Sequence, residues 1–203
     1  RTILLEKGKI EADGSTSKVI REYLKNVLEP SISQAELAHR NGRSGNGIVK
    51  FTDYYLEDVD GKLLNSVQSG KDVYFVFEYK ASKVPLERVD VGFSIHSTKN
   101  HQTLAVLYSS YQGKTFDIDE QRGTVRCCIS NFPFSEGRYR VGGRITVNGV
   151  EADWPRDGIG FIDVVEGDFY GTGKQGFGSN APLLVSGEWY IKTPTESSYR
   201  AHS

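Results

Sequence analysis

From about Gly47 onward, the chain consists of short segments in which apolar and polar side chains alternate with a period of two residues. Residues 73–80 (VYFVFEYK) and 89–96 (VDVGFSIH) show the pattern most clearly. Successive side chains of a β-strand point to opposite faces, so this alternation is typical of a strand with one buried face. Turn signals separate the segments, and no helical crossovers lie between them. The pattern predicts an all-β fold, an immunoglobulin-like antiparallel β-sandwich.

Further strands are expected around these two. They cover residues 48–59, 103–108, 125–129, 138–147 and 159–165. In the strand over 138–147, Tyr139 and Val141 are expected to face the core while the arginines between and beside them face outward. The Asn148-Gly149 pair after it is a strong signal for a tight hairpin turn.

The N-terminal residues differ from this pattern. Residues 1–28 predict two short strands followed by an amphipathic helix, which Pro30 ends. Residues 29–46 are polar and rich in glycine towards their end, which predicts a flexible linker. We therefore expect four parts, namely residues 1–28, a linker over 29–46, a sandwich over 47–191 and a tail over 192–203. Since no Met is present and Arg1 begins within a strand pattern, we expect the chain to be a piece of a longer protein.

Near the C-terminus, glycines at positions 171, 173, 176 and 178 predict a flexible arm. Residues 183–185 and 189–191 are then expected to form short apolar strands. A mobile arm followed by an apolar strand can reach a neighbouring subunit, which predicts a homodimer held by strand exchange. An edge strand on the chain's own sheet explains the same pattern, and both interpretations stay open.

Composition excludes several classes of partner. The net charge is −1, from 25 basic and 26 acidic residues, so nothing steers the chain towards nucleic acid or anionic lipid. The only cysteines are the neighbours Cys127 and Cys128, which point to opposite faces of a strand and predict free thiols in a reducing compartment. No apolar run is long enough to span a bilayer. A neutral ligand such as a sugar remains compatible with this charge.

Motifs for catalysis, cofactors and metals fail in their context. Residues 171–176 match G-x-G-x-x-G, but the residues after them cannot begin the helix that a dinucleotide site needs. The chain has no P-loop, no G-x-S-x-G and no H-E-x-x-H motif. His96 and His101 flank a turn without a suitable carboxylate, and the acidic residues at 117–120 lack the form of a calcium loop. We expect no catalytic residue, no metal and no cofactor.

Outward-facing side chains of the predicted strands suggest a carbohydrate-binding site. Sugar sites combine planar hydrogen-bonding groups for hydroxyls with an aromatic ring for the apolar face of a pyranose. The candidates are Ser94 and His96 on one strand, Arg140 and Arg144 on another, Arg126 and Glu78 on two more, and Trp154 in a loop expected over residues 152–156. An ordinary solvated sheet with scattered charges is the alternative.

Two parts of the chain resemble a known family of transport proteins. Residues 2–10 (TILLEKGKI) and 13–24 (DGSTSKVIREYL) resemble the end of an ABC transporter ATPase domain, beyond its nucleotide-binding motifs. The rest of the chain resembles the C-terminal domain of the ATPase subunit (Wzt-type) of bacterial O-antigen polysaccharide exporters. This second resemblance rests on residues 45–48, 58–61, 74–79, 128–139 (CISNFPFSEGRY), 160–164 and Trp189.

The resemblance implies a non-catalytic, cytoplasmic β-sandwich that binds O-antigen polysaccharide for export across the inner membrane. It implies as partners the ATPase domain of the same chain, the transporter membrane subunit and a second copy. A module that only dimerises the ATPases, or docks on the membrane subunit without binding glycan, is the alternative. A glycosidase ranks last because no paired carboxylates share one face.

Overall fold

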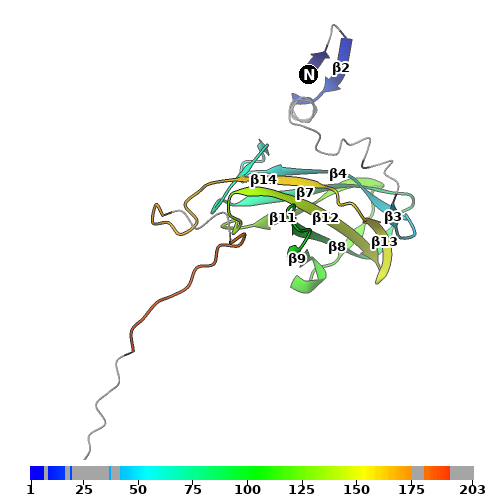
Figure 1. The fold of residues 1–203 in the computed structure, drawn as a ribbon. Coiled ribbons are helices and arrows are strands. Elements are labelled where there is room, and N and C mark those ends of the chain that lie inside the picture. Colours follow the sequence, from blue (N-terminus) through cyan, green and yellow to red (C-terminus); the bar gives the residue numbers. More distant parts are fainter. Residues whose placement is uncertain (7–8, 17–18, 20–36, 38–41, 175–180, 193–203) are drawn as a thin grey trace, which may run out of the picture.

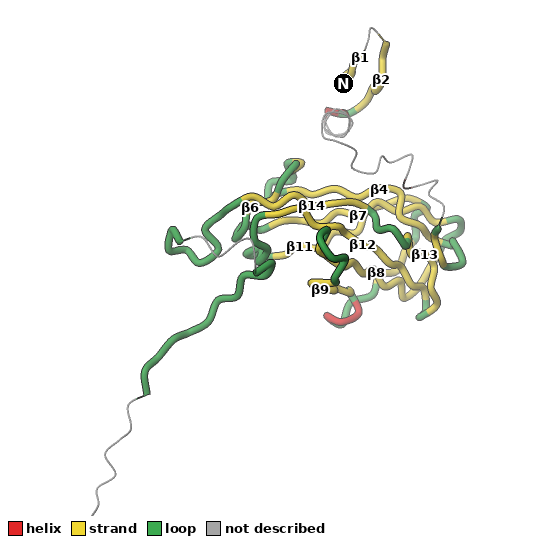
Figure 2. Tube along the Cα trace, in the orientation of Figure 1, coloured by secondary structure: helices red, strands yellow, loops and turns green. Residues whose placement is uncertain are grey.

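The computed structural model describes residues 1–6, 9–16, 19, 37, 42–174 and 181–192. Regular structure in this part of the chain is almost entirely β-strand, as Figure 2 shows, apart from the short 3-10 helix η1 (Ser110–Gln112) and single helical residues at positions 16, 19 and 37. The prediction of an all-β fold is therefore confirmed. The strands form a two-stranded, a four-stranded and an eight-stranded sheet (Figure 1).

The four-stranded sheet is antiparallel. Its order is β11 (Arg122–Ile129), β7 (Val73–Ala81), β4 (Val49–Glu57) and β5 (Leu63–Leu64). The long alternating segment of the sequence thus becomes β7, the strand that both β4 and β11 pair with. Its inward side chains, Phe75 and Phe77, are almost completely buried.

The eight-stranded sheet is built around the long pair β8 and β12. Its main path is β10 (Phe116–Ile118), β8 (Leu86–Ser97), β12 (Gly137–Val147), β13 (Val150–Pro155) and β3 (Arg43–Ser44). Beside this path, β9 (Thr103–Tyr108) pairs with β8, β14 (Gly160–Val165) pairs with β12, and β6 (Val67–Gln68) runs parallel to β14. The hairpin turn between β12 and β13 lies at Asn148-Gly149 as predicted, and both residues have positive φ angles.

Aromatic rings join the two larger sheets into one core. The ring of Phe93 on β8 lies 4.7 Å from the ring of Phe75 and 5.2 Å from that of Phe77, centroid to centroid. Such pairs contribute about 0.5–1.5 kcal/mol each beyond the area that they bury. Tyr139 and Val141 on β12 are buried as predicted. The two sheets thus face each other across a shared core, while their immunoglobulin-like classification stays a prediction.

Three details differ from the sequence prediction. Alternation places Val76 on the solvent side, but it is buried, because the longer side chains of the neighbouring strands flank it on the central strand. Arg43 and Ser44, expected in a flexible linker, form β3 and pair with β13. Trp189 to Ile191, expected as a strand, have none in the described residues 181–192 and are almost fully exposed.

At the N-terminus, β1 (Thr2–Glu6) and β2 (Lys9–Gly14) form an antiparallel hairpin, in agreement with the two predicted strands. The backbone N–H of Val19 donates to the carbonyl of Ser15 at 3.0 Å, which is one helical turn. The rest of the predicted helix, the first part of the predicted linker and most of the tail lie outside the described residues. The origin of this piece in an ATPase domain remains a prediction.

Candidate functional site

Five of the seven candidate residues lie on one surface, the outer face of the eight-stranded sheet. We use this name for the side of β8, β12 and β13 that points away from the core. In the β8–β12 register, Arg140 lies opposite His96, Gly142 opposite Ser94 and Arg144 opposite Gly92. Because these residues alternate with the buried positions of their strands, the packing of the core fixes their outward direction.

His96 forms the centre of a hydrogen-bonded row. Its Nε2 lies 2.7 Å from the Ser94 hydroxyl, and its Nδ1 lies 3.1 Å from the hydroxyl of Thr103 on β9. Partial burial lowers the pKa of His96, and the positive charge of Arg140 lowers it further. The imidazole is therefore neutral at pH 7, with one nitrogen donating and the other accepting. Both ring nitrogens are thus engaged within the row, and the hydroxyls of Ser94 and Thr103 keep lone pairs for a partner.

Two glycines leave room beneath these side chains. A Cβ on Gly142 would lie 2.6 Å from the Ser94 hydroxyl oxygen and 3.2 Å from His96 Nε2. A Cβ on Gly92 would lie 2.2 Å from the ring of Tyr108, so that ring lies directly over the glycine. Glycine at both positions lets polar and aromatic groups lie flat against the sheet.

Arg144 is held between two strands by polar partners. Its Nε donates to the carboxylate of Glu151 at 3.0 Å, and a hydrogen bond with Tyr108 raises the pKa of the guanidinium. Its Cζ lies 5.2 Å from the centroid of the Trp154 ring. Arg144 therefore connects the aromatic ring on β9 with the one on β13.

Trp154 lies on strand β13, which corrects the prediction of a loop over residues 152–156. Its neighbour Asp153 is buried inward, so the indole points outward. The guanidinium of Arg156 lies 3.6 Å from the ring centroid and covers one face of the indole. The expected stacking surface is thus an indole and a guanidinium together, a planar pair that offers hydrogen bonds at the edge of the guanidinium.

Three aromatic or basic residues on this face were not among the candidates: Tyr108, Tyr111 and Arg156. The rings of Tyr108 and Tyr111 lie 5.1 Å apart, and Tyr111 is 76% exposed. Alternation along β9 places Tyr108 outward, so the sequence pattern of this strand could have predicted its position on this face. Tyr111 follows in η1, and no periodicity predicts where a residue of such a short turn will point.

The remaining two candidates lie on the opposite side of the molecule. Arg126 and Glu78 point outward from the four-stranded sheet, on β11 and β7. Arg126 forms an ion pair with Glu57 at 2.8 Å and lies over the ring of Tyr74. The structure therefore does not bring them together with the other five.

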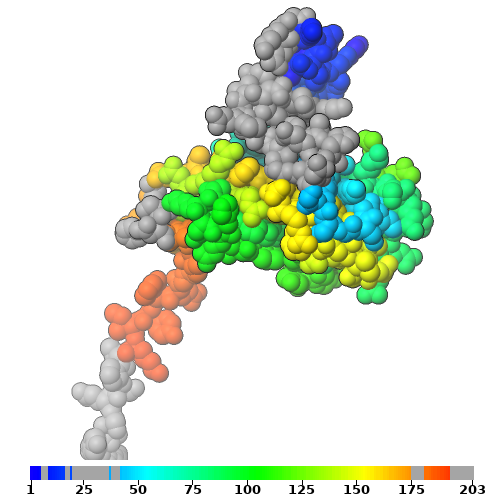
Figure 3. Space-filling view, turned by 45° about the vertical axis from the view of Figure 1, so that its right-hand side comes forward, coloured from blue at the N-terminus to red at the C-terminus, as the bar shows by residue number. Residues whose placement is uncertain are grey.

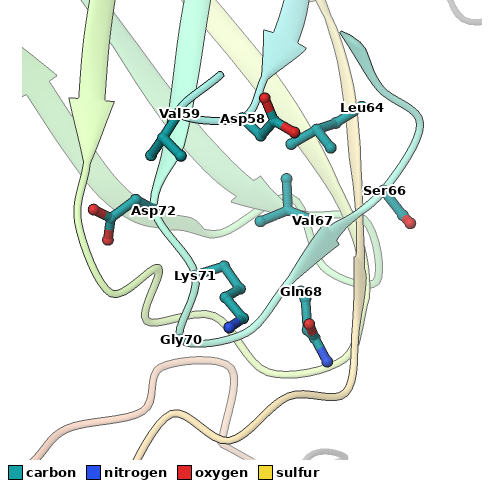
Figure 4. Close-up of a pocket in the computed structure, with 9 residues that line it drawn as sticks. All are labelled: Asp58, Val59, Leu64, Ser66, Val67, Gln68, Gly70, Lys71 and Asp72. Carbon is teal, nitrogen blue, oxygen red and sulfur yellow. The ribbon is translucent and has the colours of Figure 1, made fainter. Parts of the chain in front are cut away.

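A separate cavity of about 430 Å³ lies at the end of β4 and the start of β7 (Figure 4). Its lining residues are Asp58, Val59, Leu64, Ser66, Val67, Gln68, Gly70, Lys71 and Asp72. Both of its carboxylates accept backbone N–H groups: Asp58 accepts those of Asp60 and Lys62 in its own turn, and Asp72 accepts that of the distant Asn131. One oxygen of each carboxylate is thus committed to the backbone.

Within the part of the chain that the structure describes, no cluster of three His, Cys, Asp or Glu side chains has the spacing to hold a metal ion. None of the described helical residues belongs to a segment long and apolar enough to cross a membrane. Cys127 is half-buried and its neighbour Cys128 is exposed, and neither forms a disulfide. Burial raises the pKa of Cys127, which keeps its thiol protonated at neutral pH.

Comparison with known proteins identifies one family. The family model of the Wzt C-terminal domain matches residues 40–174, which is more than half of the chain. A solved structure of the C-terminal domain of Wzt is similar with a TM-score of 0.60 and 13% identity, covering 76% of this chain and 90% of that one. At this identity the likeness is one of fold.

Two other solved structures are similar over part of the fold. They are the alkylpurine DNA glycosylase AlkC of Pseudomonas fluorescens (TM-score 0.39, 14% identity, 73% of this chain and 38% of that one) and the CARDB domain of the PF1109 protein of Pyrococcus furiosus (0.33, 12%, 61% and 100%). TM-scores below 0.5 do not define a common fold. No curated protein sequence matches the chain.

Proposed function

The chain belongs to the Wzt C-terminal domain family, and from this premise we propose that it is a non-catalytic domain that binds carbohydrate. It recognises O-antigen polysaccharide and presents it for ATP-driven export across the inner membrane. The polysaccharide binds to the outer face of the eight-stranded sheet.

The observation that carries this proposal is the combination of groups on that face. Tyr108 and the Trp154–Arg156 pair supply flat surfaces for the apolar faces of sugar rings. Further along β8 and β12, beside the Arg144 that joins these rings, Arg140, His96 and Ser94 supply planar or rotatable hydrogen-bonding groups. Sugar rings need this mixture, because each hydroxyl must replace its bond to water while the ring carbons are desolvated.

We place the domain in the cytoplasm, joined to an ATPase domain and in contact with the transporter membrane subunit. The family assignment and the resemblance of residues 2–24 to the end of an ABC ATPase domain support this placement. The domain then holds the polysaccharide close to the ATPase that drives its transport. It needs no cofactor or metal for this task.

We further propose a homodimer that forms by strand exchange at the C-terminus. Leu183 forms a bridge with Phe134, and Leu184 is buried, so the segment starts attached to its own domain. Beyond it, residues 185–192 run away from both large sheets (Figure 1), and Trp189, Tyr190 and Ile191 are 97%, 85% and 93% exposed. Apolar side chains in an extended segment suit a neighbouring copy, and two sites per dimer would bind a polymer with avidity.

The same exposed segment favours the second candidate function, a module that only dimerises or docks the ATPase.

A titration with polysaccharide separates the two candidate functions. We expect isothermal calorimetry to detect binding of the chain to the O-polysaccharide of its own organism. We expect Tyr108→Ala to weaken it at least tenfold, since the variant loses the apolar area that the ring buries against a sugar, and tenfold corresponds to about 1.4 kcal/mol. Arg122→Gln, an exposed change on β11, should leave binding unchanged. A folded dimer that ignores millimolar polysaccharide would establish the structural module instead.

A further inference from the structure

Charge is distributed unevenly on the outer face of the eight-stranded sheet. Arg138 pairs with Asp163 at 3.7 Å, and Arg144 pairs with Glu151 at 3.0 Å. A third carboxylate, Asp90, accepts hydrogen bonds from the hydroxyls of Ser109 and Ser110 and from the Ser110 N–H, in the turn after β9. These acidic groups are thus already committed.

Two guanidinium groups on the same face lack a carboxylate partner among the residues that the structure describes. Within the described residues, neither Arg140 nor Arg156 has a carboxylate within salt-bridge distance. The whole chain carries a net charge of only −1, so these two cations are not the result of a general excess of basic residues. A local excess of guanidinium groups at a binding face indicates a ligand that brings its own negative charge.

The position of Arg140 suits an oxyanion next to a sugar hydroxyl. Arg140 lies across from His96 in the β8–β12 register, and its side chain runs over Gly158, where a Cβ would lie 3.1 Å from Nη1. The glycine therefore lets the guanidinium lie low on the sheet on the β14 side of β12, while His96 lies opposite Arg140 on the β8 side. An anion there would contact a rigid fork of N–H donors, and a polymer that crosses β12 from it would meet the Ser94 hydroxyl.

Arg156 is oriented by a different contact. Its guanidinium lies 3.6 Å from the centroid of the Trp154 ring, so the indole supports its plane and leaves its N–H edge for a ligand. Because the stacking contact already restricts the side chain, Arg156 loses less conformational entropy when it binds an anion. Arg156 is therefore prepared for a second contact with the same polymer.

Resting on the proposed function, we infer that the polysaccharide bound by this chain carries an acidic group, and that Arg140 is the residue that selects it. The group is an oxyanion on a sugar, either the carboxylate of a uronic acid or a phosphate ester. Arg140 donates two hydrogen bonds to it while Arg156 contacts an adjacent part of the polymer. A purely neutral polysaccharide would use the aromatic rings and leave both guanidinium groups without a charged partner.

The test uses the O-polysaccharide of the organism that encodes the chain, in native, carboxyl-reduced and dephosphorylated forms. We expect the native form to bind and one of the two treatments to weaken binding about tenfold or more, as loss of a charge-assisted pair of hydrogen bonds predicts. Weaker binding after carboxyl reduction identifies a carboxylate, and weaker binding after dephosphorylation identifies a phosphate. Equal binding of all three forms would overturn the acidic selection and leave the proposed function standing, whereas no binding of any form would overturn both.

A matched pair of variants tests whether Arg140 causes the preference for the acidic polysaccharide. Arg140→Gln should lose the preference for the native over the neutralised polymer while still binding the neutralised form, and Arg122→Gln on the other sheet should keep the preference. As a spectroscopic readout, the native polymer should raise the pKa of His96, because an anion beside the imidazole favours its protonated form. An Arg140→Gln variant that is folded and keeps the full preference would contradict the inference.

Discussion

Arg43 and Asp153 form a buried ion pair that ties the entry of the chain into the domain to the strand that carries Trp154. Arg43 Nε donates to Asp153 Oδ1 at 2.8 Å, and a second bond joins Nη2 to Oδ2. Asp153 also accepts the N–H of Phe51 at 2.9 Å, and Arg43 donates to the carbonyls of Leu37 and Phe51. Figure 3 shows the cyan segment of β3 against the yellow of β13.

Replacing Arg43 by Met should destabilise the domain strongly. The side chain of Asp153 is 1% exposed, and without Arg43 its charge would be buried and unpaired, which costs about 3–5 kcal/mol. Chemical denaturation measures the free energy of unfolding. The control is Arg138→Met, whose pair with Asp163 is exposed and 3.7 Å long and should contribute about 0–1 kcal/mol. Equal losses for the two variants would refute the structural role of the buried pair.

The protonation of His96 should make stability depend on pH in a definite direction. Its pKa in the folded chain lies below the ordinary value of about 6.5, because burial and Arg140 disfavour the charged form. The unfolded chain therefore binds a proton first as pH falls, and the folded state loses stability as pH drops below about 6.5 towards the folded pKa. We expect wild type to lose more stability between pH 7.5 and 5.5 than His96→Gln. An imidazole NMR titration with a midpoint above 6.5 would be incompatible with this.

Adding a methyl group at either glycine of the binding face should disturb binding more than folding. In Gly92→Ala the Tyr108 ring must move away from a Cβ that would lie 2.2 Å from it, and in Gly142→Ala the hydroxyl of Ser94 must move. Both affected side chains are partly exposed and can shift, so we expect weaker polysaccharide binding with the fold retained. Gly187→Ala, where nothing lies within 4 Å, is the control. Unchanged affinity in both variants would place the site elsewhere.

The exposed C-terminal segment should determine the oligomeric state. Light scattering is expected to find a dimer for the full chain and a monomer after Trp189→Ser and Ile191→Ser are combined, because strand exchange depends on burying these side chains. Val59→Ser changes an apolar residue that is 62% exposed elsewhere and should preserve the dimer. A full chain that is monomeric, or a dimer that survives both serines, would eliminate the exchange.

Much of the fold was predictable because alternation reports directly which side of a strand is buried. The inward sets of β7, β8 and β12 follow from it, with Phe75, Phe93 and Val141 in the core. Val76 shows the limit, since an outward residue becomes buried when neighbouring strands supply long side chains around it. The short strand β3 was hidden because its pairing with β13 depends on Arg43 reaching Asp153, 110 residues away.

The candidate site was predictable strand by strand but not as a whole. Alternation placed Ser94, His96, Arg140 and Arg144 outward, yet only the register of β8 and β12 shows that they adjoin. No local pattern assigns a strand to a sheet, so Arg126 and Glu78 were grouped with residues on the far side of the core. The cover of Arg156 over Trp154 is likewise a tertiary contact that spacing alone does not reveal.

Mapping the contact surface tests the central claim most directly. Isotope-labelled chain is titrated with native O-polysaccharide while backbone NMR signals are followed. We predict that shifts concentrate at Ser94, His96, Gly142 and Tyr108, and that Glu78 and Arg126 on the four-stranded sheet do not respond. Shifts confined to the four-stranded sheet or to the cavity around Val67, or no shifts at millimolar polysaccharide, would contradict the account.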